Sequence, residues 1–190
     1  MQHVLPEQSM TLGADLRALR KSRGLTLVDL AERLDRSVGW LSQVERDKSE
    51  PSITDLRQIA AILGVSLSML FRQEAAPAGE AGYVVRKAAR RPIDPKVDGL
   101  IEELLSPDLT DDFEMVHSTF EPGSGVKQPV TRPTQEVAFL LSGTLTVEIA
   151  GVAFRIKPGD SFRIRGEPFR WWNPGSEPAV AIWVIAPPVY

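Results

Sequence analysis

The chain has 190 residues, of which 43% are apolar and 25% charged, with a formal net charge of -3. This composition is that of a globular protein with one or two domains. The chain contains no cysteine, which excludes disulfides, thiolate metal sites and cysteine nucleophiles. No apolar run approaches the ~20 residues of a membrane span, and residues 1–10 do not resemble a signal peptide, so we expect a cytoplasmic protein without a membrane partner. The acidic sum alone argues against nucleic-acid binding, because phosphate contacts need a basic surface.

Residues 11–71 show the apolar periodicity of short helices. Leu27, Leu30, Ala31 and Leu34, for example, recur at i, i+3, i+4 and i+7. Five short helices are predicted in about sixty residues. Their start and stop signals are two capping boxes, two further serine caps and two glycines at helix ends: Thr26 with Asp29, Ser52 with Asp55, Ser37, Ser66, Gly24 and Gly64.

The second half of the chain changes to a period of two. Residues 73–82 (QEAAPAGEAG) read as a linker. Strands separated by Pro and Gly turns are predicted at 83–89, 99–105, 113–121, 136–141, 144–150, 152–156, 161–165, 169–173 and 179–186. This spacing is typical of an antiparallel sandwich or barrel. The expected organisation is a tail (1–10), a helical domain (11–72), the linker (73–82) and a β domain (83–190).

Residues 26–35, a break at Arg36 and residues 37–48 have the proportions of a helix-turn-helix. The segments LRALRKSRGLTLVDLAERL and SVGWLSQVERDKSEPSITDLRQIAAILGVSLSMLF resemble the XRE-type, lambda-repressor-like DNA-binding domains over 12–71, essentially without gaps. The resemblance implies an all-α domain whose second motif helix enters the major groove of an operator. A domain of this kind that only contacts proteins is the alternative.

The resemblance also implies residue roles. Ser37 would cap the recognition helix, and Val38, Gly39 and Gln43 would face base edges. Gln43 can pair with adenine through both amide atoms, whereas Val38 can only pack on a thymine methyl. The residues expected toward the phosphate backbone are Thr26, Ser42, Arg46 and Lys48.

Several neighbouring residues carry open alternatives. Glu45 is expected to pair with a first-helix arginine such as Arg17, and Trp40 to pack rather than to read a base. The basic run from Arg17 to Arg23 is either a set of phosphate contacts or a solvated helix face. Asp47 departs from the glycine common in the family; aspartate tolerates the left-handed conformation at some cost in strain.

The segment PGSGVKQPVTRPTQEVAFLLSGTLTVEIAGVAFRIKPGDSFRIRGEPFRWWNPGSEPAVAIWVI resembles the small cupin domain, over roughly 114–186. The resemblance implies an all-β jelly-roll barrel, also called a double-stranded β-helix, with a dimer face formed in part by 83–113. A helix-turn-helix followed by a cupin resembles bacterial transcription regulators whose barrel binds a small effector. The expected fold is therefore a five-helix domain followed by a cupin.

Metal-binding cupins hold their ion with three histidines and a glutamate, and the matching positions here are Val130, Arg132, Glu136 and Phe169. Only Glu136 can ligate, and the cationic Arg132 would repel a divalent ion. His3 lies in the expected tail, and His117 is a lone strand residue. We therefore expect no metal, no cofactor and no catalysis. A metal-dependent oxygenase- or epoxidase-like cupin enzyme carrying a helix-turn-helix is the disfavoured alternative.

Strand alternation would turn one set of side chains into the barrel. The expected ligand-binding residues are Gln128, Arg132, Glu136, Phe169 and Trp171. Arg132 would hold a carboxylate or phosphate and Glu136 an amine or hydroxyl, so an amino acid or related metabolite would suit. The alternative is a purely structural Arg132–Glu136 ion pair. Trp172 and Trp183 have the opposite or an uncertain parity and are expected to be packing or interface residues.

The sequence thus predicts a homodimeric regulator whose small-molecule effector changes operator binding. Residues 1–72 hold ten Lys and Arg against nine Asp and Glu, and residues 73–190 hold twelve against sixteen. DNA binding would therefore depend on a small basic set, Arg17 to Arg23 with Arg46 and Lys48, and on base contacts, with a shallow dependence on salt.

Overall fold

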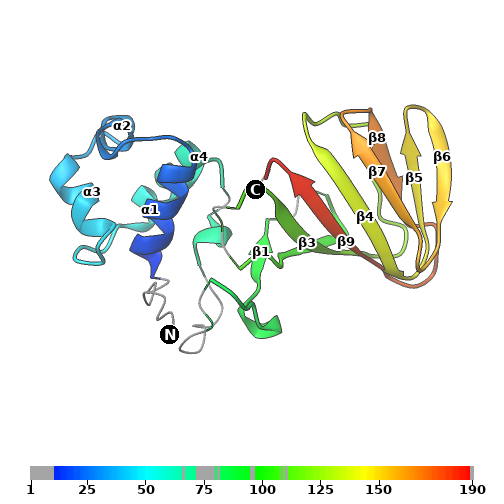
Figure 1. Cartoon of the computed structure of the whole chain (residues 1–190). Coiled ribbons are helices and arrows are strands. Elements are labelled where there is room, and N and C mark those ends of the chain that lie inside the picture. Colours follow the sequence, from blue (N-terminus) through cyan, green and yellow to red (C-terminus); the bar gives the residue numbers. More distant parts are fainter. Residues whose placement is uncertain are drawn as a thin grey trace, which may run out of the picture. The chain divides into compact units, whose positions relative to one another are not determined.

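The computed structural model describes residues 11–65, 67–71, 80, 82–94, 97–107, 109 and 111–188 (Figure 1). The chain divides into two compact units. The helical unit comprises 1–91 with 107–110, and the barrel unit comprises 92–106 with 111–189.

The described part of the helical unit contains four α-helices rather than five. Both capping boxes form, with the side chains of Thr26 and Ser52 accepting from the backbone N–H of Asp29 and Asp55. The expected fifth helix is a single 3-10 turn, because only three residues after the left-handed Gly64 (φ 70°) take up helical geometry; Ser66 lies outside the described residues. The elements are α1 (Leu12–Ser22), α2 (Leu27–Arg33), α3 (Val38–Val44), α4 (Ile53–Leu63) and the turn Ser68–Leu70.

The apolar stripes of these helices form one core, as their periodicity predicts. The helical residues with the least exposed side chains are Leu16, Leu19, Leu30, Leu41, Ile59 and Leu63. Within the described residues, no helix has the length and apolar character needed to cross a membrane.

The barrel unit consists of two sheets. The six-stranded sheet has the order β1-β2-β3-β9-β4-β7 and the three-stranded sheet the order β6-β5-β8. Their inner faces meet where Phe120 contacts Trp171 edge-on, with ring centroids 4.6 Å apart. The strands are β1 (Arg91–Ile93), β2 (Leu100–Leu104), β3 (Glu114–Phe120), β4 (Gln135–Ser142), β5 (Leu145–Ile149), β6 (Val152–Ile156), β7 (Ser161–Arg165), β8 (Phe169–Trp172) and β9 (Ala179–Ala186).

Most predicted strands are confirmed within two residues, but the predicted strand at 83–89 is wrong. That segment contains turns and a short 3-10 helix, Lys87–Ala89, and Arg86 forms an ion pair with Glu80 at 2.5 Å. A local turn stabilised by a local ion pair has replaced the extended conformation that the apolar Tyr83–Val85 run suggests. Arg91 then donates to the carbonyl of Met69 at 2.9 Å and pairs with Asp15 on α1, so the chain remains attached to the helical unit as far as Arg91.

Strand β4 shows how the barrel is lined. Its buried residues alternate strictly with exposed ones: Glu136, Ala138 and Leu140 point inward, while Val137 and Phe139 point outward. The same alternation holds in β3, where every second residue is buried. The inner surface therefore carries one buried glutamate on β4 among apolar neighbours.

Candidate functional site

Helix α3 has a buried and an exposed face. Its N-terminus is capped by the Ser37 hydroxyl, which accepts the Trp40 backbone N–H at 3.1 Å. Leu41 and Val44 are fully buried against the helical core. The expected base-facing residues, Val38, Gly39 and Gln43, all lie on the exposed face. The structure thus brings them together on one surface, with no other side chain of the unit within 4 Å of a Cβ built on Gly39.

The residues expected toward phosphates lie around this surface. Thr26 is exposed at the start of α2, and its hydroxyl donates to Asp29 at 2.6 Å, a bond that lowers the pKa of that carboxyl. Beyond α3, Arg46 is exposed and its Nε–H donates to the Ser42 carbonyl at 2.9 Å, while Lys48 is exposed. Two cationic side chains therefore follow the recognition helix.

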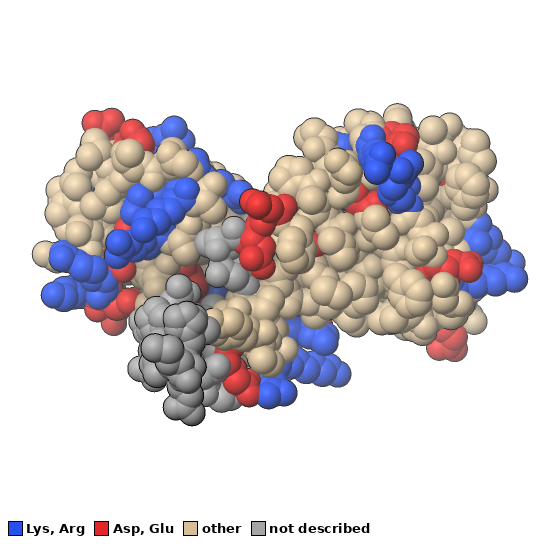
Figure 2. Space-filling view, in the orientation of Figure 1, with Lys and Arg blue, Asp and Glu red and all other residues tan. Residues whose placement is uncertain are grey.

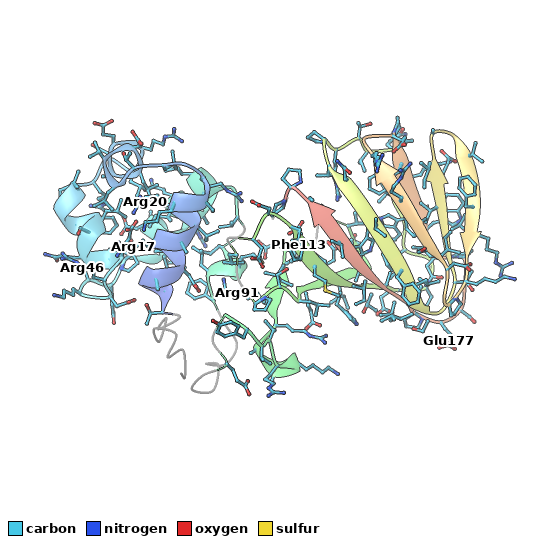
Figure 3. The ribbon with its side chains drawn as sticks, viewed as in Figure 1. Arg17, Arg20, Arg46, Arg91, Phe113 and Glu177 are labelled. Atoms are coloured by element: carbon cyan, nitrogen blue, oxygen red, sulfur yellow. The ribbon has the colours of Figure 1, made fainter. Side chains whose placement is uncertain are left out.

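The partner of Glu45 is Arg20, not Arg17; Figure 3 labels both arginines on α1. Arg20 donates through Nε to Oε1 at 2.6 Å and through Nη2 to Oε2 at 2.9 Å, and its Nη1 donates to the Leu25 carbonyl. These bonds to Glu45 raise the pKa of Arg20. Arg20 lies on the same inward face of α1 as Leu16, whereas Arg17 lies on the exposed face. A buried, bidentate pair thus fixes α1 against the end of α3.

Because of this pairing, fewer basic side chains of the helical unit are left for contacts with phosphates. Arg20 is committed to Glu45, and Arg23 donates through Nε to the Leu63 carbonyl at 2.9 Å. Figure 2 shows Lys and Arg side chains on the face of the helical unit where Figure 3 labels Arg17 and Arg46, with acidic side chains close by. The basic surface is therefore local rather than continuous.

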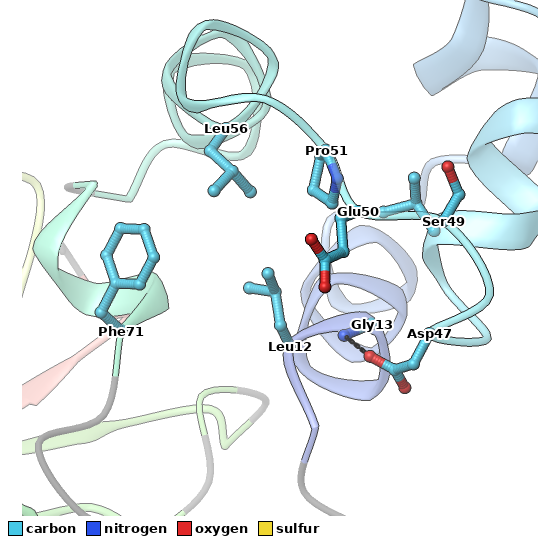
Figure 4. Close-up of a pocket in the computed structure, with 9 residues that line it drawn as sticks. Leu12, Gly13, Asp47, Ser49, Glu50, Pro51, Leu56 and Phe71 are labelled. Carbon is cyan, nitrogen blue, oxygen red and sulfur yellow. Dashed lines mark hydrogen bonds between the residues drawn. The ribbon is translucent and has the colours of Figure 1, made fainter.

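Asp47 has a structural role that was not predicted from the sequence. It adopts the left-handed conformation (φ 55°), as expected for the position where the family has glycine. Its carboxylate accepts the Gly13 N–H at 2.9 Å (Figure 4) and also the Thr11 hydroxyl. Asp47 therefore caps the N-terminus of α1 from a distant part of the chain, which offsets the backbone strain.

A cavity of about 380 Å³ lies beside Asp47; Figure 4 shows the residues that line it. None of the expected base-facing or effector-binding residues contributes to it. Its lining residues are Leu12, Gly13, Val44, Asp47, Ser49, Glu50, Pro51, Leu56 and Phe71.

Trp40 packs, as expected, rather than pointing freely outward. The Arg36 guanidinium lies 5.3 Å from the centre of its ring and also donates to Asp55 at 2.8 and 3.1 Å. The Ser52 hydroxyl, followed by Arg36, holds the pKa of Asp55 below its usual value. This chain of contacts connects the turn before α3 to the first turn of α4.

In the barrel unit, Glu136 is the central polar group. Its side chain is 1% exposed. Oε1 accepts the Thr134 hydroxyl at 2.6 Å and lies 3.9 Å from Nη1 of Arg132, which is too long for a hydrogen bond. Oε2 is buried and, in the part of the chain that the structure describes, has no hydrogen-bond partner. A carboxylate with one bonded and one unbonded buried oxygen is an incomplete arrangement.

The neighbours of Glu136 do not fit a metal ion. Val130 and Phe169 are joined by two backbone hydrogen bonds, and neither side chain can ligate. Arg132 places its guanidinium 5.6 Å from the Phe169 ring centre, where it contributes positive charge. His117 lies on the outward side of β3, 4.0 Å from Glu103. Among the described residues, no three His, Asp or Glu side chains are grouped so as to hold a metal.

The other expected effector-binding residues are only partly brought together. Phe169 and Trp171 are buried inside the barrel, as the alternation predicts. Gln128 is exposed, so the expectation that it faces the interior is wrong; it precedes the paired residue Val130 and belongs to no strand.

Two inward-facing residues were missed. Trp183 packs edge-on against Phe162 at 5.3 Å, and its Nε1 is buried without a hydrogen-bond partner. Its parity with the buried Ala181 and Ile185 on β9 would have revealed its orientation. Thr134, which holds Oε1 of Glu136, has no comparable signal because it precedes β4.

The two units match two known domain families. Residues 11–70 match a helix-turn-helix domain and residues 116–185 a cupin domain. The chain is 24% identical to the HTH-type transcriptional regulator PuuR of Escherichia coli, over 84% of this chain and 85% of PuuR. It is 37% identical to the transcriptional regulator ClgR of Mycobacterium tuberculosis, over 37% of this chain and 73% of ClgR. It is also 40% identical to the immunity repressor of Bacillus phage phi105, but over 34% of this chain and less than half (45%) of the repressor.

Solved structures of both regulators and enzymes resemble the chain loosely. An HTH_3 family transcriptional regulator from Vibrio cholerae superposes with a TM-score of 0.43 and 22% identity, over 93% of this chain and 95% of the other. FeII HppE superposes with a TM-score of 0.45 and 16% identity, over 93% of this chain and 98% of the other.

A capped helix with an exposed polar face, carried on a helix-turn-helix scaffold, defines a DNA-binding transcription regulator. More specifically, the chain belongs to the XRE-type helix-turn-helix transcriptional regulators that carry a cupin domain.

Proposed function

We propose that the protein is a cytoplasmic, homodimeric regulator that reads an operator with α3 and binds a small polar effector in its barrel. The observation that carries the effector role is the buried Oε2 of Glu136, which has no hydrogen-bond partner among the described residues. Effector binding changes the affinity for the operator by a coupling free energy of about 1–3 kcal/mol.

Operator recognition is assigned to the exposed face of α3. Gln43 presents an amide that can donate to and accept from adenine, and Val38 presents an apolar surface for a thymine methyl. Thr26, Ser42, Arg46 and Lys48 contact the phosphate backbone and fix the orientation of the helix. Two such helices in a dimer would read half-sites about one DNA turn, roughly 34 Å, apart.

Effector binding is assigned to the space around Glu136. Oε2 would accept a hydrogen bond from an ammonium or hydroxyl group, and Arg132 would hold a carboxylate. Phe169 and Trp171 supply an apolar wall, and Gln128 lies exposed at the barrel surface. An amino acid or a related carboxylate metabolite meets these requirements.

A purely structural Arg132–Glu136 pair is less well supported. A structural pair in a barrel interior should be short and should satisfy both carboxylate oxygens. Here the closest approach is 3.9 Å, and the Arg132 side chain is 37% exposed. The non-catalytic role follows from the same residues, because Val130, Arg132 and Phe169 offer no metal ligand. Stoichiometric iron in the purified protein would instead favour the metal-dependent cupin enzyme.

The operator role is tested by selecting bound genomic fragments and comparing two glutamine variants on them. Gln43→Ala should lose about 1–3 kcal/mol of discrimination at one base position, roughly 5- to 150-fold in relative affinity, and keep its fold. Gln58→Ala, on the exposed face of α4, should behave as wild type. Equal base preference in the Gln43→Ala and wild-type proteins would contradict the assignment.

The effector role is tested by adding the twenty standard L-amino acids singly to the protein bound to its operator. A responding amino acid should lose its effect on Arg132→Ala, while operator affinity without it stays measurable. Arg155→Ala, on the exposed β6, is the control that should keep the response. An unchanged response in Arg132→Ala would favour the structural ion pair.

A further inference from the structure

The outward face of the six-stranded sheet is apolar where an outer sheet face is usually polar. On β4 the outward residues Val137, Phe139 and Leu141 are 48%, 43% and 48% exposed. On the adjacent β9, Val184 stands opposite Val137 and Ile182 opposite Phe139. Apolar side chains therefore occupy both faces of these two strands, although only the inward set packs in the barrel.

The apolar surface continues onto the next strand and ends at charged edges. Met115 of β3 stands opposite Val184 and His117 opposite Ile182, so one face of three neighbouring strands is covered by mostly apolar side chains. This contiguous apolar surface is exposed on β4 and at Val184 and half-buried at Met115, Val180 and Ile182, and a surface of this kind marks an interaction site. We call it the outer face; its central members are Met115, Val137, Phe139, Leu141, Val180, Ile182 and Val184.

The size of the outer face suits a dimer. Together with its flanking strands β2 and β7, the outer face spans five neighbouring strands. At about 4.8 Å spacing, and with about seven residues per strand at roughly 3.4 Å per residue, these strands cover roughly 500–600 Å². Two copies packed face to face would therefore bury about 1,000 Å² or slightly more. That total reaches the lower range of specific protein interfaces.

The two edges of the outer face carry opposite charges. On β7, Arg163 stands opposite Val137 and points outward. On β2, at the other edge, Glu103 stands opposite His117, whose Nδ1 lies 4.0 Å from its carboxylate. Arg165 adds a second positive charge on the β7 side, and Glu167 in the following turn lies near both arginines. One edge is thus basic and the other acidic.

A two-fold axis along β9 brings these opposite edges together. Such an axis reverses the strand order in the second copy, so that β7 of one copy lies over β2 of the other. Arg163 and Glu103 differ by two residues in level along the strands, about 7 Å, which an arginine side chain can span. The pair then forms twice, once at each edge. Under this two-fold rotation the basic edge and the acidic edge of the surface complement each other. Self-association requires such self-complementary charges, whereas binding of an unrelated partner does not.

We propose that a second copy of this chain docks on the outer face, with Phe139 and Ile182 at its centre and Arg163 opposite Glu103 of the second copy. The inference rests on the proposed function in one respect, that the regulator acts as a dimer, and it identifies the surface that forms this dimer.

The first test compares two phenylalanine-to-arginine variants of the full chain by sedimentation equilibrium. Phe139→Arg places a charge in the outer face, whereas Phe154→Arg places one on β6 of the other sheet, where Phe154 is 48% exposed. Wild type and Phe154→Arg should be dimers and Phe139→Arg a monomer, and near-UV circular dichroism should show a native signal for all three proteins. A dimeric Phe139→Arg protein, or a wild type that stays monomeric at high concentration, would overturn the proposal.

The second test addresses the orientation of the two copies. Glu103→Arg and Arg163→Glu should each weaken the dimer about tenfold, because each places like charges opposite one another twice. The double variant should recover most of the wild-type association, since the charges are exchanged but still complementary. Double-variant association no stronger than that of either single variant would overturn the two-fold arrangement along β9.

Operator binding separates this inference from the proposed function. Monomeric Phe139→Arg should keep its base preference on a single half-site and lose tight binding to the paired half-sites. If the wild type dimerises through the outer face but has no operator, the proposed function fails and the dimer surface stands. If the wild type binds an operator but Phe139→Arg remains dimeric, the dimer surface fails and the operator role stands.

Discussion

Glu45 of the helical unit and Glu136 of the barrel unit are both buried, but their carboxylates differ in how completely they are hydrogen-bonded. Glu45 in the helical unit is 7% exposed, and both of its oxygens accept hydrogen bonds from Arg20 at 2.6 and 2.9 Å. Glu136 in the barrel unit is 1% exposed, and only one of its oxygens has a hydrogen bond, from Thr134. Its nearest guanidinium stays 3.9 Å away.

The difference shows which buried charge serves the fold. A paired and fully bonded carboxylate costs little to bury, and removing its partner is expensive. A buried carboxylate oxygen without a hydrogen-bond partner lowers the stability of the folded state, and the fold alone does not need such a group. Glu45 is therefore best understood as part of the scaffold that positions α3, whereas Glu136 is the group to which the proposed effector role is assigned.

The largest effect is expected from breaking the satisfied pair. Arg20→Met should destabilise the helical unit by about 3–5 kcal/mol, because Glu45 would remain buried and unpaired. Arg17→Met, on the exposed face of α1, should cost less than about 0.5 kcal/mol. Urea denaturation of the full chain, followed by far-UV circular dichroism, measures both. Similar stability of the two variants would show that Glu45 is not dependent on Arg20.

Replacing Glu136, unlike replacing Arg20, is not expected to destabilise the unit that contains it. Glu136→Gln removes a buried charge but keeps the side-chain shape and the acceptor for Thr134, so the barrel should be unchanged or more stable by about 1 kcal/mol. Thermal unfolding monitored by tryptophan fluorescence reports this change. Glu148→Gln, which loses a part-exposed pair with Arg170, is the control and should lose at most about 1 kcal/mol. A loss of about 3 kcal/mol in Glu136→Gln would make that glutamate structural as well.

A smaller effect, dependent on pH, is expected at the start of α4. The Ser52 hydroxyl and Arg36 lower the pKa of Asp55, so its contribution is present above the usual carboxyl pKa and is lost as the pH falls through the lowered value. Asp55→Asn should therefore cost about 1 kcal/mol at neutral pH and flatten the loss of stability below about pH 4. Melting temperatures between pH 7 and pH 3 test this, with Glu32→Gln on the exposed face of α2 as the control. Parallel pH profiles for Asp55→Asn and wild type would contradict it.

The sequence predicts those features that depend on neighbours along the chain. The capping boxes at Thr26 and Ser52 formed, because both partners lie within four residues. The strands were found because their alternation is local. Contacts between residues far apart in the sequence were harder to predict. The helical period alone does not indicate which arginine of α1 pairs with Glu45. Nothing in the sequence near Asp47 indicates that it caps α1.

The barrel interior was predicted only in part. Glu136, Phe169 and Trp171 were placed correctly by parity, and Trp183 could have been, since β9 alternates without interruption. Gln128 was misplaced because parity has no meaning outside a strand. The unpartnered oxygen of Glu136 depends on distances of a few tenths of an ångström, which no sequence pattern conveys.

Two glycines of the helical unit differ in how freely evolution can replace them. A Cβ on Gly13 would lie 2.3 Å from the Val44 carbonyl oxygen, so any side chain there would push α3 away from α1. A Cβ on Gly39 would meet nothing within 4 Å, and replacing a helical glycine usually stabilises a helix by about 0.5–1 kcal/mol. The position that seats the recognition helix is thus closed to change, while an outward position beside Gln43 is open. In the proposed operator role of α3, a single substitution at Gly39 changes the base-facing surface without any need to rebuild the scaffold.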